Sequence, residues 1–183
     1  MDLFPPPAVL LVELSRMTRS LVSITSERSL GASCANVWLL WTTRKGLESW
    51  WSPDGFRMEV TALEIRVGGP IEFRYEDAGS AGDYVWRSAL QAGGLTSSWT
   101  ARGSFLEVDA PRRLAFRQAL DFGSKAATQE YRMTAEFQED PAGARVLLTA
   151  EATPSKHWGL LGRTNLEGQL DRLAKACAAA DAA

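Results

Sequence analysis

The segment 128-TQEYRMTAEFQ-138 alternates between apolar and polar side chains, a pattern typical of a β-strand with one buried face. The apolar phase consists of Tyr131, Met133, Ala135 and Phe137, and the polar phase of Arg132, Thr134 and Glu136. A turn signal, 140-DPAG-143, follows this segment, and 144-ARVLLTAEA-152 then predicts a partner strand. The two segments therefore predict an antiparallel hairpin with one apolar and one solvated face.

Segments closer to the N-terminus show similar strand patterns. Further strands are predicted over 21–31, 56–65, 70–77, 83–91, 98–108 and 112–120. Short turn signals separate most of these segments, and Gly68-Gly69 predicts a tight turn that requires a positive φ. Glutamates on the polar strand phase, namely Glu64, Glu72, Glu76, Glu136 and Glu151, are expected on the solvated face.

Helices are predicted at two places. Ser33 can cap a first helix from Cys34 that closes with Arg44 and Lys45, and a second short helix over 46–51 stops before Pro53. The last helix, within 155–180, carries apolar residues at helical spacing: Leu160, Leu161, Leu166, Leu170, Leu173 and Cys177. Its apolar stripe requires a partner, and the apolar sheet face is available, which indicates an α+β domain.

Length and composition narrow the class of protein. The chain has 183 residues, 45% hydrophobic residues and a net charge of -2, which favours one globular domain and gives no electrostatic support for nucleic-acid binding. No apolar run is long enough to span a membrane, and the N-terminus lacks the pattern of a secretory signal, so a cytoplasmic location is expected. Residues 1–20 are expected to be a flexible extension, with Met17 as an alternative start. Two separate thiols at Cys34 and Cys177 are favoured over a disulfide.

A set of small motifs then carries a family resemblance that runs from about residue 22 to 177. The motifs are Ala32, Val37-Trp38, Thr42, Leu47, Trp50-Trp51, 66-RVGG-69, Gly103, Glu107-Val108, Pro111, Arg113-Leu114, Gly168 and Leu170. In this order they resemble the helix-grip fold of the SRPBCC superfamily, which includes START domains, the birch-pollen allergen and polyketide cyclases. The chain is most similar to the branch named for the homologue of the activator of the 90-kDa heat-shock-protein ATPase.

The resemblance implies a single domain over 21–180, in which a curved antiparallel sheet of about six to seven strands wraps around the C-terminal helix. It also implies an internal cavity for a hydrophobic small molecule. Three departures stand out. The proline that is common just before the first helix is absent. Residues 78–98 resemble an insertion, read as a lid or an extra hairpin, and Gln169 replaces the aromatic residue that often follows the glycine of the final helix.

Aromatic residues, with one arginine, are the candidate ligand-binding groups, because apolar walls with a few polar points are typical of ligand pockets. The candidates are Trp51, Phe73, Tyr75, Tyr84, Trp86, Arg87, Trp99, Phe116, Tyr131 and Trp158. Within the neighbouring pair, Trp50 is expected to pack against Trp38 or Trp41, and Trp51 is expected to face the mouth of the cavity.

The sequence offers little specific chemistry beyond such binding. His157 is the single histidine, and with two distant cysteines it provides no metal-ligand spacing, so neither a metal nor another cofactor is expected. No nucleophile motif is present, and catalytic residues are not identified.

Three functions stay open. Binding of a hydrophobic or aromatic small molecule is favoured, and a polyketide cyclase or dehydratase using Arg87, Tyr75, Tyr131 or Asp83 is the alternative. A chaperone partner is third. The sequence does not decide whether the chain is an enzyme or a homodimer.

Overall fold

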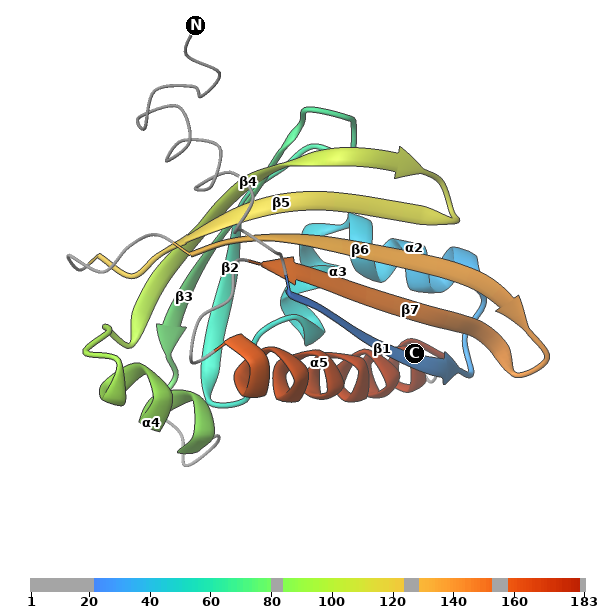
Figure 1. Ribbon diagram of the computed structural model, residues 1–183. Helices are drawn as coiled ribbons and strands as arrows, with labels where there is room; N and C mark the ends of the chain where they lie inside the picture. The colour runs from blue at the N-terminus through green and yellow to red at the C-terminus, as the bar shows by residue number, and fades with distance from the viewer. Residues whose placement is uncertain (1–21, 80–83, 124–128, 153–157, 182–183) are drawn as a thin grey trace, which may run out of the picture.

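The computed structural model describes residues 22–79, 84–123, 129–152 and 158–181, which form a seven-stranded antiparallel sheet and four helices (Figure 1). The strands are β1 (Val22–Leu30), β2 (Phe56–Leu63), β3 (Pro70–Asp77), β4 (Ser98–Asp109), β5 (Arg113–Asp121), β6 (Gln129–Asp140) and β7 (Gly143–Ala152). The helices are α2 (Cys34–Thr42), α3 (Arg44–Trp50), α4 (Tyr84–Ala92) and α5 (Trp158–Asp181). The predicted α+β class and the long C-terminal helix are confirmed.

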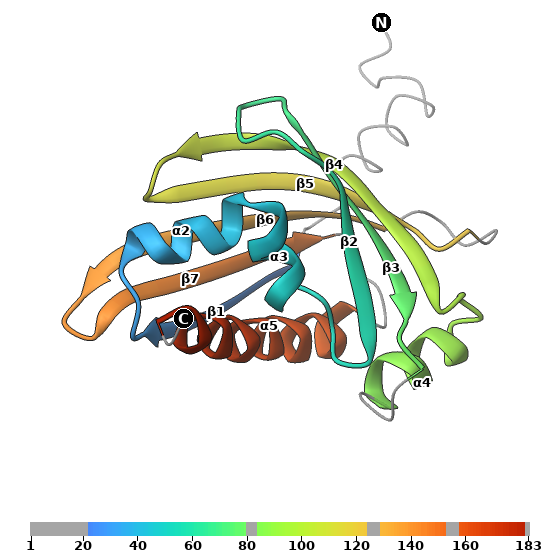
Figure 2. The same cartoon turned by 180° about the vertical axis from the view of Figure 1, so that it is seen from behind.

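The strands are ordered β1-β7-β6-β5-β4-β3-β2, so β1 and β2 lie at opposite edges. The chain between them crosses the inner face of the sheet through α2 and α3, and α5 lies along β1 and β7 (Figure 2). Register shifts between Val60 and Ala62, and between Phe105 and Glu107, mark irregularities of the kind that bend strands. The sheet therefore curves around the helices on its inner face.

Alternation places the apolar side chains of the strands inside. Ile71, Phe73 and Tyr75 on β3 are buried, and Met133, Ala135 and Phe137 on β6 are buried as well. The register sets Tyr75 opposite Trp99 and Phe116 opposite Met133, so large side chains of neighbouring strands meet on one face. Gly68 has a φ of 77°, as the predicted tight turn requires.

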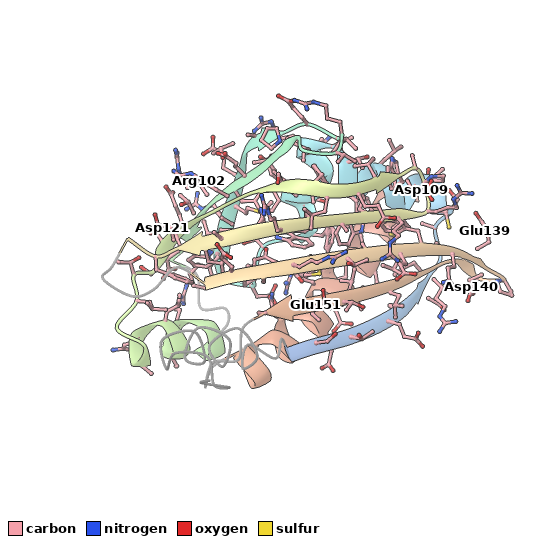
Figure 3. All side chains as sticks on the ribbon, turned by 45° about the horizontal axis from the view of Figure 1, so that its top comes forward. Arg102, Asp109, Asp121, Glu139, Asp140 and Glu151 are labelled. Atoms are coloured by element: carbon pink, nitrogen blue, oxygen red, sulfur yellow. The ribbon has the colours of Figure 1, made fainter. Side chains whose placement is uncertain are left out.

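Charged side chains occupy the outer face. The expected solvated glutamates are exposed or half-buried there, and Glu72 and Glu151 pair across strands with Arg102 and Arg132 at 3.9 Å. Figure 3 shows Arg102 and Glu151 on this side of the sheet. The polar face is therefore a solvated surface, and the inner face holds the interior of the protein.

The boundary between the first two helices differs from the prediction. Arg44 and Lys45 begin α3 and do not close α2. The reason is Thr43, whose extended backbone ends α2 and whose side chain accepts a hydrogen bond from the Gly46 amide at 3.1 Å, which caps α3.

The strand predicted over 83–91 is wrong, because this segment contains helix α4, and the alternative of an extra hairpin falls with it. Tyrosine, valine and tryptophan at its start favour a strand, whereas the alanine, leucine and glutamine that follow favour a helix. The helix places Arg87 and Leu90 one turn apart, so that Leu90 is buried while Arg87 bonds to Asp77. These tertiary contacts select the helix.

No helix in the described ranges is long and apolar enough to cross a membrane. Cys34 and Cys177 are not joined in a disulfide, in line with the predicted separate thiols, and both are buried. Burial raises the pKa of the Cys34 thiol, and a hydrogen bond and the negative charge of Glu139 raise it further.

Candidate functional site

Five of the predicted binding residues form one continuous group of buried rings on the inner face of the sheet. This aromatic wall consists of Trp51, Phe73, Tyr75, Trp99 and Phe116. Trp51 caps α3, and the other four come from β3, β4 and β5. Because alternate residues of a strand share a face, the sheet aligns rings from three strands opposite the end of α3.

The rings of the aromatic wall contact one another directly. Trp51 lies 6.1 Å from Phe73 and 6.0 Å from Phe116 between ring centroids. Tyr75 stacks on Trp99 at 4.6 Å with an interplanar angle of 10°, and Phe56 packs against Trp99 from β2 at 5.1 Å. Phe56 was not among the predicted site residues, although its position on the apolar phase of β2 was visible in the sequence.

Polar atoms interrupt this apolar surface at two points. The indole nitrogen of Trp51 donates a hydrogen bond to the Tyr75 hydroxyl at 2.9 Å, and both side chains are buried. The Tyr131 hydroxyl donates to the side-chain oxygen of Gln118, whose amide nitrogen in turn donates to the carbonyl of Ile71 at 3.1 Å. The interior therefore contains two fixed hydrogen-bonded pairs.

Burial controls the protonation of both tyrosines. It raises the pKa of Tyr75 well above its ordinary value, and the nearby Tyr131 adds to the shift, whereas the Trp51 hydrogen bond and the charge of Arg172 oppose it. Burial also raises the pKa of Tyr131. Both hydroxyls are neutral near pH 7, so they can donate or accept hydrogen bonds and are poor bases.

Helix α5 adds two polar side chains that the sequence prediction missed. Gln169 is 3% exposed, and its amide nitrogen lies 3.5 Å from the carbonyl oxygen of Trp51. Its side-chain oxygen is buried without a hydrogen-bond donor, and the same holds for the side-chain oxygen of Asn165. Leaving a buried polar atom unpaired costs about 1–3 kcal/mol. A signal was present, because Gln169 lies on the apolar stripe formed by Leu166, Leu170 and Leu173.

Arg87 holds α4 against the end of β3 and is not part of the aromatic wall. Its guanidinium bonds both carboxylate oxygens of Asp77, at 2.6 and 3.0 Å, and the carbonyl of Gly55 at 3.3 Å. It also lies 5.9 Å from the centre of the Phe56 ring. The hydrogen bonds from Arg87 are the main cause that lowers the pKa of Asp77.

The neighbouring tryptophans have partly separate roles. Trp50 packs on Trp41 at 4.8 Å and donates to the Leu40 carbonyl at 3.0 Å, as its predicted role in joining the two helices requires. Trp51 does not lie at an opening, because it is 2% exposed. Its ring contacts Trp41 at 5.3 Å and Trp50 at 5.2 Å as well as the aromatic wall, so it joins the two groups.

Some predicted residues lie outside the described part of the chain. Tyr84, Trp86 and Trp158 belong to α4 and α5, but their side chains are not among those described, and Asp83, His157 and the extension 1–20 are not described at all. Within the described ranges, no group of three or more histidine, cysteine, aspartate or glutamate side chains could hold a metal ion.

Solved structures of bacterial proteins share this fold. The crystal structure of a Chromobacterium violaceum protein superposes with a TM-score of 0.68 at 19% identity, covering 85% of this chain and 96% of that one. The solution structure of an AHSA1-like protein from Aeromonas hydrophila gives 0.64 at 20% identity, covering 87% and 94%. A Nitrosomonas europaea protein gives 0.66 at 18% identity, covering 88% and 97%. At these identities the likeness shows the fold alone.

None of the curated proteins matches the chain. Residues 31–178, which begin directly after β1 and end in the last turn of α5, match the family described as Activator of Hsp90 ATPase homolog 1-like protein. The order of elements, the sheet topology and this match agree with the resemblance of the sequence motifs. The chain belongs to the Activator of Hsp90 ATPase homolog 1-like family, within the helix-grip SRPBCC superfamily.

Proposed function

We propose that this protein binds a hydrophobic or aromatic small molecule between the inner face of its sheet and α5. The observation that carries the proposal is the buried side chain of Gln169, whose oxygen has no donor although it lies beside the aromatic wall. A folded protein pairs nearly all of its buried polar groups, so an unpaired one indicates a missing partner such as a ligand or a water molecule.

The placement of the elements supports the same proposal. Helix α5 packs mainly on β1 at the sheet edge and also meets α2, α3 and β7. The aromatic wall, which lies on β3, β4 and β5 and at the end of α3, is therefore away from the sheet edge on which α5 mainly packs. Aromatic surfaces with a few fixed polar groups are typical of small-molecule sites.

The alternative functions have weaker support. A cyclase or dehydratase needs a proton acceptor in the site, but the raised pKa values of Tyr75 and Tyr131 leave these hydroxyls neutral. Arg87 is engaged by Asp77 at the sheet edge. For a chaperone partner, the large exposed apolar residues of the described chain are Leu39, Val67 and Leu106. Such scattered residues are ordinary on a surface.

Native mass spectrometry of the freshly purified full chain tests the proposal. We expect a second charge-state series, heavier than the protein by the mass of one small molecule, and release of that molecule on denaturation. Titration with 2-naphthol in isothermal calorimetry is a second test that does not depend on a co-purified molecule, and we expect saturable one-to-one binding. No retained molecule and no saturable binding of 2-naphthol would contradict the proposed function.

A further inference from the structure

Two unpaired acceptor atoms lie in line on α5. Asn165 and Gln169 are four residues apart, which places them one above the other on the same helix face, and the side-chain oxygen of each is buried without a donor. The orientation of the Gln169 amide follows from its surroundings. Its nitrogen faces the Trp51 carbonyl, and exchanging nitrogen for oxygen would set two acceptors against each other. The group left over on Gln169 is therefore an acceptor, and the structure orients Asn165 with its oxygen unpaired as well.

The surroundings of this pair are mostly apolar, which penalises charge, but they include the guanidinium of Arg172, three residues beyond Gln169 on the same helix, which donates to the Trp50 carbonyl. Leu166 and Leu170 of the same helix are buried beside the pair, and Trp51 is the residue that Gln169 reaches. The raised pKa values of Tyr75 and Tyr131 have the same cause, because burial penalises the charged form of any group that enters this interior. A partner for the two oxygens therefore needs hydrogen-bond donors, and a neutral partner avoids both the cost of burying a charge and repulsion between a cation and Arg172.

We propose that Asn165 and Gln169 form a polar anchor that accepts hydrogen bonds from hydroxyl or N–H groups of a neutral aromatic ligand whose ring lies on the aromatic wall. This inference rests on the proposed function and specifies the chemistry of its ligand. It distinguishes phenols and aromatic amines or amides from hydrocarbons, from ethers and from fatty acids, whose ionised carboxylate offers the two acceptors no donor.

Paired probes that differ by one donor test the anchor. The first pair is 2-naphthol and 2-methoxynaphthalene, and the second is 4-phenylphenol and 4-methoxybiphenyl, because methylation removes the donor and keeps the ring. Calorimetry on the wild-type chain is expected to show about five- to tenfold tighter binding of each phenol than of its ether, the range of one net hydrogen bond.

The variants Gln169→Leu and Asn165→Leu distinguish the contribution of the polar anchor to ligand affinity from that of the aromatic wall. We expect the preference for the phenol to fall below about twofold in Gln169→Leu and to shrink in Asn165→Leu, with ether binding preserved. Glu167→Gln, an exposed change on the same helix, is the matched control and should keep the full preference. Thermal unfolding of each variant checks that the fold is retained, and preserved ether binding provides a second check.

The outcomes are distinct. Equal binding of phenol and ether by the wild-type chain, or a preference that survives both leucine variants, overturns the anchor and leaves the two oxygens to buried water. Binding of neither member of either pair overturns the proposed function and the anchor with it. Tighter phenol binding that depends on Gln169 supports both.

Discussion

Two neighbouring groups in the interior differ in how their buried polar atoms are paired. One is the tryptophan cluster, formed by Trp41, Trp50 and Trp51. The other is the α5 polar pair, Asn165 and Gln169, in which Gln169 reaches the Trp51 carbonyl. In the tryptophan cluster the Trp50 nitrogen reaches the Leu40 carbonyl, and the Trp51 nitrogen reaches Tyr75. The Trp41 nitrogen has no oxygen acceptor but lies among aromatic rings, whose faces are weak acceptors.

The polar pair has no such substitute, because a carbonyl oxygen needs a donor and gains little from apolar neighbours. The difference teaches that these two neighbouring parts of the interior have different purposes. The tryptophan cluster is a packed core that joins α2 and α3, whereas under our proposal a bound molecule supplies the donors that the polar pair lacks. Substitutions in the tryptophan cluster should therefore change mainly the free energy of unfolding, and substitutions in the polar pair should change mainly ligand affinity.

Trp50→Ala is expected to have the largest effect on stability. Trp50 is 1% exposed and packs on Trp41, so its removal leaves a cavity and should lower the free energy of unfolding by about 3–5 kcal/mol. Urea denaturation followed by circular dichroism measures this change. The exposed Leu39→Ala on α2 is the control, with an expected change within about 0.5 kcal/mol. A loss below about 1 kcal/mol for Trp50→Ala would show that the cluster is not the core described above.

Trp51→Phe should affect both properties. The change keeps a ring against Phe73 and Phe116 but removes the donor to Tyr75, so the free energy of unfolding should fall by about 1–2 kcal/mol. Binding of 2-naphthol should weaken several-fold in calorimetry, because this ring belongs to the aromatic wall. A stable variant with unchanged 2-naphthol affinity would remove Trp51 from the proposed site.

Gln169→Leu should act in the opposite direction on stability. Replacing an amide whose buried oxygen has no donor relieves a desolvation cost that exceeds the loss of its long 3.5 Å contact with the Trp51 carbonyl, so the ligand-free protein should gain about 1 kcal/mol. Urea denaturation of ligand-free wild-type and variant protein measures the difference. A loss of more than about 1 kcal/mol would mean that the Gln169 side chain completes a structural network in the folded protein.

The smallest effect concerns α4 and depends on pH. Folding lowers the pKa of Asp77 through Arg87, so the stability that this pair contributes is fully present above the unfolded pKa of about 3.9. It is lost as the pH falls through the lowered pKa of the folded state. Protection factors of the α4 amides from hydrogen exchange should therefore fall in acid, with little change in the rest of the fold.

Asp77→Asn should show the low protection of α4 at pH 7 already. Glu59→Gln, which breaks the exposed pair of Glu59 with Arg74 on neighbouring strands, is the matched control and should leave α4 protected. If Asp77→Asn and the wild-type chain give equal protection of α4 at pH 7, the ion pair does not hold this helix.

Much of the fold followed from patterns in the sequence, because burial of one sheet face imposes a strict period of two. The alternation at Ile71, Phe73 and Tyr75 predicted β3, and the helical spacing of Leu166, Leu170 and Leu173 predicted α5. Local patterns failed at 83–91 and at Thr43. There a tertiary ion pair and a side-chain cap decided the structure.

The candidate site was predictable only in part. Aromatic residues on the apolar phase of known strands had to share a face, so Phe73, Tyr75 and Trp99 could be named. Asn165 and Gln169 were not named, because a polar residue in an amphipathic helix is ordinarily assigned to the solvated side, although Gln169 lies on the apolar stripe of α5. Only the packing of α5 against the sheet shows that these two oxygens are buried.

The central claim is that the interior between α5 and the aromatic wall, which includes Trp51, receives the ligand, and that Trp41 and Trp50 do not contact it. Two-dimensional ¹H–¹⁵N NMR of the full chain during titration with 2-naphthol tests it most directly, by following the side-chain amide of Gln169 and the indoles of Trp51 and Trp50. The account predicts saturable shifts for Gln169 and Trp51 with one common affinity, and a nearly unchanged Trp50 indole. Saturable shifts confined to exposed residues, or no shift of Gln169 while Trp50 moves, would contradict it.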